Sequence, residues 1–257
     1  MSKCLLPSIE FDITNKCNLK CAGCCHFSNL TTEENLYDLN EFEKDIIRLN
    51  NLFIIKKFKI VGGEPFLVDN IIDYVKVIIK YFTNSRIEIY TNNTLRNKIQ
   101  NFLIKCKELN YNNIKIRISE YPLIASNTNN NNNIYYTNKE KFKLVNLNLK
   151  GNSNPEIAHS CCFTSSTWSL FKGKIYICPI AKNINTFIEK FKLEHIDLEN
   201  AYIDIYKNTA IDILDYLYNF DKGLSYCRYC KYEHPTIKWK ISNNTISEYI
   251  SEEVNYE

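Results

Sequence analysis

Residues 9–24 read IEFDITNKCNLKCAGC and join a predicted β-strand to a loop that carries three cysteines. Ile9, Phe11 and Ile13 alternate with polar residues, which is the pattern of a strand with one buried face. The cysteines follow at the spacing Cys-x3-Cys-x2-Cys, as Cys17, Cys21 and Cys24. In α/β barrels, the loops after the carboxyl ends of the strands hold the reacting groups. The stretch therefore predicts an α/β fold with a functional loop directly after its first strand.

Downstream of this loop, apolar residues recur alternately at strand and helix spacing up to about residue 150. Further strands are expected over 58–61, 87–89, 114–118 and 142–149. Helices are expected over 42–53, 68–82 and 95–109, with Asp38 or Asn40 as N-cap of the first and Thr94 as N-cap of the third. This alternation predicts a parallel sheet with right-handed crossovers. Periodicity alone does not decide whether that sheet closes into a barrel.

After about residue 155 the pattern changes to a cysteine-rich segment. Residues 168–171 and 175–178 predict a β-hairpin with Gly173 in its turn, and a helix is expected to carry Ile205, Ile213, Leu214 and Leu217. A second set of cysteines lies here, namely Cys162, Cys178, Cys227 and Cys230. We therefore expect two domains, 1–155 and 156–257, the second being a small hairpin-plus-helix unit.

Composition excludes several classes of protein. The 257 residues carry a net charge of +3 and no basic block, so nucleic-acid binding through phosphates is not expected. No apolar run is long enough to span a membrane. The eleven cysteines are an odd number in a chain without secretory features, which disfavours a disulfide scaffold. Metal or redox chemistry in the cytoplasm is the expected use of these thiols.

Three thiolates on one short loop can bind three irons of a 4Fe–4S cluster, whose complete ligation takes four cysteines. The fourth iron then stays open to another ligand. The alternative is a zinc knuckle in which Cys25 or His26 supplies the fourth ligand. After the second predicted strand comes Gly62-Gly63-Glu64-Pro65, whose glycines can bring backbone C=O and N–H groups close to a ligand.

The cysteine triplet and the Gly-Gly-Glu-Pro segment together resemble the radical S-adenosylmethionine (SAM) superfamily. The resemblance implies that Cys17, Cys21 and Cys24 hold a 4Fe–4S cluster whose open iron chelates the amino and carboxylate groups of SAM. It implies that reduction cleaves SAM to methionine and a 5′-deoxyadenosyl radical, which abstracts a substrate hydrogen. The fold it implies is a partial, open TIM-type barrel of parallel βα units.

The same resemblance assigns SAM contacts to the ends of further strands. The family's Gly-Gly-Glu segment receives the methionyl amino group, which implies SAM-binding roles for Gly62, Gly63, Glu64 and Pro65. Thr91-Asn92-Asn93 resembles the family's Thr-Asn-Gly, and Ser119 matches a common ribose or carboxylate contact. The sequence departs from the family at Gly23, where many members have an aromatic residue near the adenine. We expect His26 or Phe27 to take over that contact.

The second cysteine set resembles the twitch extension, a shortened form of the SPASM domain. Ten residues separate Cys162 from Gly173 and four separate Gly173 from Cys178, before the later Cys227-x2-Cys230. The resemblance implies an auxiliary 4Fe–4S cluster with four protein ligands. Cys161 is the alternative first ligand, and we favour Cys162 because successive residues of a strand face opposite ways. A structural zinc site with four cysteines is the alternative metal centre.

The leading hypothesis is thus an oxygen-sensitive radical SAM enzyme in which the cofactor performs the radical step while the protein binds and orients. The family implies an external electron donor of the flavodoxin or ferredoxin type. Residues 24–28 resemble a subgroup associated with surface-polysaccharide genes, which favours a sugar or small metabolite as substrate. The alternatives are a peptide-modifying maturase, a non-enzymatic scaffold with two zinc sites, and an iron–sulfur electron carrier without SAM chemistry.

Overall fold

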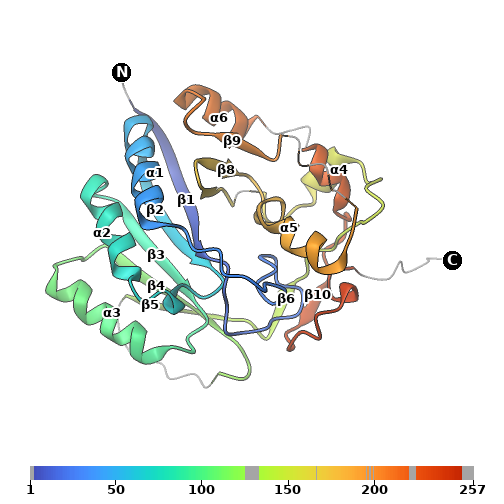
Figure 1. Ribbon diagram of the computed structural model, residues 1–257, viewed down its shortest axis with the longest axis horizontal. Coiled ribbons are helices and arrows are strands. Elements are labelled where there is room, and N and C mark those ends of the chain that lie inside the picture. The colour runs from blue at the N-terminus through green and yellow to red at the C-terminus, as the bar shows by residue number, and fades with distance from the viewer. Residues whose placement is uncertain are drawn as a thin grey trace.

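The computed structural model describes residues 3–124, 133–165, 167–194, 196, 198, 200–219 and 224–250. Its main feature is an eight-stranded sheet with the order β5-β4-β3-β2-β1-β7-β8-β9 (Figure 1). The strands are β1 (Cys4–Thr14), β2 (Phe53–Gly62), β3 (Arg86–Thr91), β4 (Ile114–Glu120), β5 (Ile134–Asn138), β7 (Ser169–Phe171), β8 (Lys174–Tyr176) and β9 (Tyr202–Asp204). β1 to β5 run parallel, and β7 joins the free side of β1, also in parallel.

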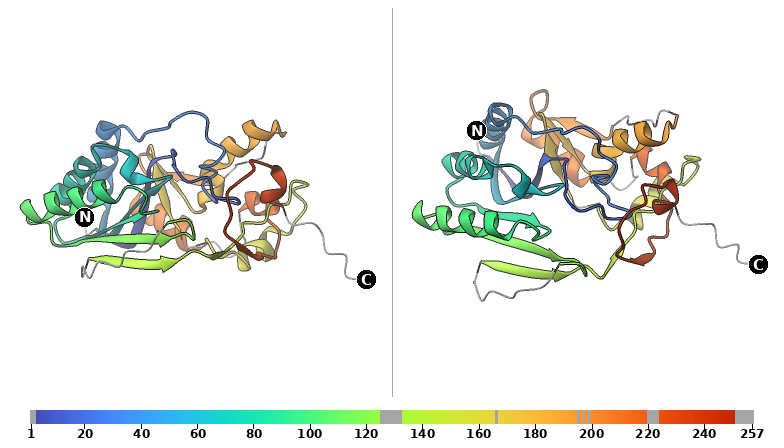
Figure 2. Two further views of the ribbon diagram at one scale, coloured as in Figure 1. Left: turned by 90° about the horizontal axis from the view of Figure 1, so that it is seen from below. Right: turned by 60° about the horizontal axis from the view of Figure 1, so that its bottom comes forward.

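Three helices connect the parallel strands and cover one face of the sheet, as Figures 1 and 2 show. They are α1 (Leu39–Leu52), α2 (Ile71–Tyr81) and α3 (Arg96–Glu108). Each new strand from β1 to β5 adds to the same edge, so the sheet winds in one direction and leaves β5 and β9 as separate edges. This confirms the predicted α/β fold of parallel βα units in an open, partial barrel.

The apolar residues of the strands pack under these helices. Phe11, Phe58, Ile89 and Ile116 are fully buried or nearly so, within one large core cluster. Because side chains alternate along a strand, the residues between them face away from the helices. At the start of α1, the Asp38 side chain accepts hydrogen bonds from the first turn, which selects it over Asn40 as the N-cap.

Two predicted details of the first half are wrong. The fifth parallel strand is β5 rather than residues 142–149, because the polar edge segment Ile134–Asn138 gives a weaker apolar signal than 142–149 does. From the latter segment only β6 (Lys141–Lys143) is a strand, and it pairs with β10 (Thr236–Lys238) in a separate antiparallel sheet. Thr94 does not cap α3, since its backbone N–H and its hydroxyl are both donated to Asn92 Oδ1.

The second half contains the predicted hairpin as β7 and β8, with Lys172 and Gly173 in the turn. The helix α5 (Pro179–Phe191) follows it and was not predicted. The expected helix is α6 (Ala210–Tyr218), which begins after Ile205 with a capping box at Thr209. The remaining elements are α4 (Pro155–Ser160) and the 3-10 turns η1 (Pro65–Leu67), η2 (Ser225–Tyr229) and η3 (Ile246–Glu248).

The division into two domains near residue 155 stays a prediction. α4 begins there, while the main sheet continues across the boundary through the β1–β7 pairing. Among the described residues, none of the helices combines the length and the apolar character that crossing a membrane would require.

Candidate active site: two groups of cysteines

The loop after β1, residues 15–24, carries Cys17, Cys21 and Cys24 and is called the cysteine loop below. Each of the three cysteines is half-buried. Burial raises the pKa of Cys17 to about 12, and the neighbouring Cys24 and Cys21 thiols add to the rise. Burial likewise raises the pKa of Cys21 to about 11, with a further contribution from Cys24. Three thiols that oppose one another's ionisation fit a site where bound iron supplies the missing positive charge.

The Gly-Gly-Glu-Pro segment at the end of β2 lies against the start of this loop. The Gly63 N–H is donated to Thr14 O and the Glu64 N–H to Lys16 O, each over 2.8 Å. A Cβ at Gly63 would stand 2.0 Å from Lys16 O, and one at Gly62 would stand 2.2 Å from Thr14 O. The glycines are therefore required for contact between two backbones, and these two amides are used within the protein rather than offered to a ligand.

The carboxylate of Glu64 joins the ends of β2 and β3. It is fully buried and accepts hydrogen bonds from the Phe66 N–H (3.1 Å), the Thr91 hydroxyl (2.7 Å) and the Asn92 N–H (2.7 Å). Burial raises the pKa of Glu64, and these three donors work against that rise. Glu64 and Thr91, both predicted SAM contacts, therefore bind each other.

The Asn92 side chain extends the connection to the cysteine loop. Its amide nitrogen lies 3.7 Å from Cys17 Sγ and donates to Asn18 Oδ1 over 2.9 Å. Asn93 stands where the family motif has Gly, and its φ of 62° is a left-handed conformation that Asn tolerates. Ser119 lies at the carboxyl end of β4, so the structure brings it to the same edge of the sheet as Thr91.

The C-terminal segment packs directly on the cysteine loop. The Ala22 N–H is donated to Lys240 O (3.1 Å), and the Ser242 N–H to Lys20 O (2.8 Å). The indole N–H of Trp239 is donated to Cys21 Sγ over 3.1 Å. Trp239 belongs to no motif of the sequence and lies more than two hundred residues from Cys21, so no local pattern indicates this contact.

The same packing accounts for the departure at Gly23. Its φ of +68° is one that residues with a side chain rarely adopt, and a Cβ there would stand 2.5 Å from the Leu144 side chain and 3.1 Å from Glu248 O, so an aromatic residue would be strained at this place. Phe27, the expected substitute for the adenine contact, is 1% exposed, and its ring packs 5.2 Å from those of Phe187 and Tyr249. In this structure Phe27 is a core residue.

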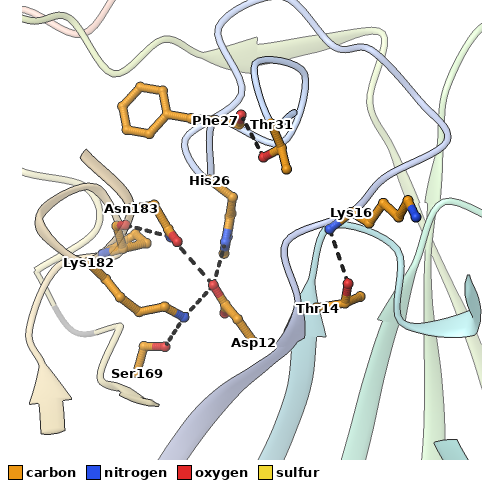
Figure 3. Close-up of polar contacts among 10 residues, drawn as sticks. Asp12, Thr14, Lys16, His26, Phe27, Thr31, Ser169, Lys182 and Asn183 are labelled. Atoms are coloured by element: carbon orange, nitrogen blue, oxygen red, sulfur yellow. Dashed lines mark hydrogen bonds and ion pairs between the residues drawn. The ribbon is translucent and has the colours of Figure 1, made fainter. Parts of the chain in front are cut away.

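A buried polar cluster lies beside the cysteine loop (Figure 3). It is on the inner face of β1, which is the face of the sheet opposite α1, α2 and α3. Asp12 Oδ2 forms ion pairs with His26 Nδ1, at 3.1 Å, and with Lys182 of α5. The Lys182 ammonium also donates to the Ser169 hydroxyl over 3.0 Å. Burial opposes the charge on Asp12, but Lys182 and His26 hold its pKa below the usual range. His26, considered above as a zinc ligand, is thus bound to a carboxylate.

The second cysteine group assembles from three segments. Cys162 follows α4 and Cys178 is the N-cap of α5. Cys227 lies within η2, and Cys230 is the C-cap of η2. Burial raises the pKa of Cys178 to about 12, and Cys162 and Cys227 raise it further. Burial raises the pKa of Cys230 as well, with contributions from the other three thiols.

Cys161 is exposed at the end of α4, whereas Cys162 is half-buried. Cys161 and Cys162 follow a helix rather than lying in a strand, so their side chains do not alternate between the two faces of a sheet as predicted. Over the described ranges, no three His, Cys, Asp or Glu side chains converge as a site for a single metal ion.

Residues 11–121 match the family model described as Radical SAM superfamily. The Probable GTP 3',8-cyclase of Methanocaldococcus jannaschii is 30% identical over 113 residues, which are 44% of this chain and 36% of that protein. The GTP 3',8-cyclase of Clostridium perfringens (strain SM101) is 30% identical over 109 residues, or 42% of this chain and 32% of that protein. The chain thus spans about a third of the length of these curated relatives.

Among solved structures, BtrN in complex with AdoMet and 2-DOIA has a TM-score of 0.57 at 18% identity, covering 90% of this chain and 94% of BtrN. BtrN in an open conformation has a TM-score of 0.53 at 19% identity, covering 89% of each chain. These two structures share the fold. The match to the radical SAM superfamily is to residues 11–121, which hold the three cysteines and the Gly-Gly-Glu-Pro segment, and that family implies a 4Fe–4S cluster, SAM, a reductant and a substrate.

Proposed function

We propose that this chain cleaves SAM reductively at a 4Fe–4S cluster held by Cys17, Cys21 and Cys24. The observation that carries the proposal is the contact of the cysteine loop with the Gly-Gly-Glu-Pro segment through Gly63 and Glu64. A cluster bound there would supply the electron that cleaves SAM and so starts hydrogen abstraction from the substrate.

The residues of this chain bind and orient SAM. Gly62 to Pro65, Thr91 and Ser119 lie at neighbouring strand ends around the cysteine loop, where they are proposed to hold it. Glu64 acts as the positioning residue, because its buried carboxylate fixes the β3 end relative to the β2 end. The crystals of BtrN in complex with AdoMet support SAM as the ligand.

The substrate is proposed to be a small metabolite, such as a sugar, rather than a peptide. By their names, the curated relatives act on GTP, which is a small molecule. The residues on the inner face of the sheet are charged and polar, and such a lining suits a polar metabolite. A peptide maturase remains the alternative outcome of substrate screening.

Cys162, Cys178, Cys227 and Cys230 are proposed to hold an auxiliary 4Fe–4S cluster. Four thiols give complete ligation, so this cluster would have no open iron. If Cys227 and Cys230 are both replaced by Ala, bound iron should fall to about half while the SAM-binding cluster is kept. Cys161→Ser is the matched control and should keep all the iron. Zinc at this site in place of iron would refute the auxiliary cluster.

The test of the main proposal is an anaerobic assay with dithionite and SAM. We expect brown protein with absorbance near ~400 nm and release of 5′-deoxyadenosine. Cys21→Ala should abolish the release, whereas Cys4→Ser, at the opposite end of β1, should preserve it. Colourless protein that contains zinc would instead establish the scaffold. Iron–sulfur protein that releases no 5′-deoxyadenosine would be an electron carrier.

A further inference from the structure

The inner face of β2, β3 and β4 carries an unusual set of charges. Lys57 and Lys59 of β2 are in register with Arg86 and Glu88 of β3, respectively. Glu88 is in turn in register with Lys115 of β4. These residues alternate with the buried apolar residues that pack under the helices, so they lie on the face opposite α1, α2 and α3.

One buried carboxylate forms ion pairs with both arginines on this face. Glu88 is 1% exposed and forms ion pairs with Arg86 Nε and Arg117 Nη2, each at 3.0 Å. Arg117 also lies over the ring of Tyr135 on β5, 4.4 Å from its centre. The arginines are thereby fixed in place, and their combined charge exceeds that of Glu88.

The lysines on the same face lie near Glu10 and Glu88 but form no ion pair in the part of the chain that the structure describes. Within the described residues, neither Lys57 nor Lys59 forms an ion pair, and Lys115 donates to the Tyr135 hydroxyl over 2.7 Å. Desolvation lowers the pKa of Lys57, the Glu88 carboxylate works against that shift, and the neighbouring cations Lys59, Arg86 and Arg117 add to it. Counting Glu10, which is in register with Lys59, five cationic side chains face two carboxylates.

We propose that this basic face, defined by Lys57, Lys59, Arg86, Lys115 and Arg117, binds a phosphate group of the substrate. The inference rests on the proposed function, since it assigns the substrate class of the same site. A surplus of three positive charges suits a phosphate, which carries close to two negative charges, better than a single carboxylate. All five cationic side chains are half-buried or exposed, so a ligand can reach them.

The position of this face fits a substrate held at two ends. Glu88 precedes Thr91 by three residues on β3, which places the basic face roughly 10 Å along the strand from the proposed SAM contacts. A phosphorylated metabolite could place its phosphate on the basic face and its reacting carbon near the cysteine loop. The Asp12–Lys182 ion pair on β1 and α5 adds no net charge to this arrangement.

The test is calorimetric titration of the anaerobically purified protein, in the presence of SAM, with glycerol 3-phosphate, glycerate and glycerol at one ionic strength. We expect glycerol 3-phosphate to bind about tenfold more tightly than glycerate, and glycerol not to bind. Replacing Lys59 and Lys115 together by Gln should weaken glycerol 3-phosphate binding about tenfold or more. Replacing both by Arg should retain it.

Lys98→Gln is the matched control, because Lys98 is exposed on α3 and pairs with Asp69 on the other side of the sheet. An equal loss of binding in this variant would overturn the proposal, as would glycerol 3-phosphate binding no better than glycerol. Glycerate binding as tightly as glycerol 3-phosphate would refute the assignment to phosphate. If the double Gln variant does not fold, Lys57→Gln replaces it under the same criteria. The heat of binding does not depend on SAM cleavage, so failure of the proposed function would be seen separately.

Discussion

At the scale of single residues, the hydrogen bond from Trp239 to Cys21 should set the reduction potential of the proposed SAM-binding cluster. Hydrogen bonds to cluster sulfurs raise the potential because they stabilise the more negative, reduced state. Trp239→Phe keeps an aromatic ring but removes the N–H that is 3.1 Å from Sγ. We expect a more negative potential, with the ratio of reduced to oxidised cluster at a fixed potential falling about tenfold, or about 59 mV for one electron.

The measurement is a redox titration followed by electron paramagnetic resonance. Trp168→Phe is the matched control, because the indole N–H of Trp168 has no hydrogen-bond partner within the described chain. An unchanged potential in Trp239→Phe would show that the contact only packs the C-terminal segment on the loop.

The effects of replacing Asp12 and Lys182 on the free energy of unfolding should depend strongly on each other, because the two side chains form an ion pair and both are more than nine-tenths buried. Lys182→Met leaves the Asp12 charge without its closest partner, so we expect a loss of about 3–5 kcal/mol in the free energy of unfolding. Adding Asp12→Asn should restore part of that loss, because the Asp12 charge is then no longer buried without its ammonium partner. Urea unfolding of the two variants measures this difference, and equal losses in both would contradict the coupling.

At the scale of elements, adding one methyl group at Gly63 should disrupt the contact between the end of β2 and the cysteine loop. In Gly63→Ala the new Cβ would meet the backbone oxygen of Lys16, which has no side-chain freedom to move aside. We therefore expect bound iron to fall by about half, as the first cluster is lost and the auxiliary cluster remains. Lys56→Ala, an exposed change on the same strand, is the control. Normal iron content in Gly63→Ala would show that the loop can shift without loss of the site.

The sequence predicted those elements whose apolar period is clear. The strands around Phe11, Ile60, Ile89 and Ile116 and the helices between them could be placed because each buries a regular stripe of apolar residues. β5 was misplaced because its Tyr-Tyr-Thr-Asn stretch at the sheet edge has little apolar alternation.

Only part of the candidate site can likewise be predicted from local sequence patterns. The three-cysteine spacing and the Gly-Gly-Glu-Pro segment predict a candidate site, and the structure places these two segments in contact. Contacts such as Trp239 to Cys21, or Lys182 to Asp12, join residues far apart in the chain, so no local pattern encodes them. The Glu64–Thr91 hydrogen bond also needed the structure, since the motifs named both residues but not their contact.

At the scale of the whole molecule, the continuous sheet should make the two predicted domains unfold together. A buried carboxylate on α1 reinforces the link across residue 155: Asp45 accepts hydrogen bonds from the Gly173 N–H (2.7 Å), the Tyr206 hydroxyl (2.6 Å) and the Tyr37 hydroxyl.

Asp45→Ala leaves these donors without their acceptor, so we expect a loss of about 2–4 kcal/mol in the free energy of unfolding. Because β7 pairs with β1, this loss should lower the midpoint of a single urea transition, followed both by tryptophan fluorescence and by cluster absorbance. Lys44→Ala, exposed on the same helix, should leave the midpoint unchanged. Two separate transitions in the wild-type protein would instead show that the parts on either side of residue 155 are independent domains joined by a weak interface.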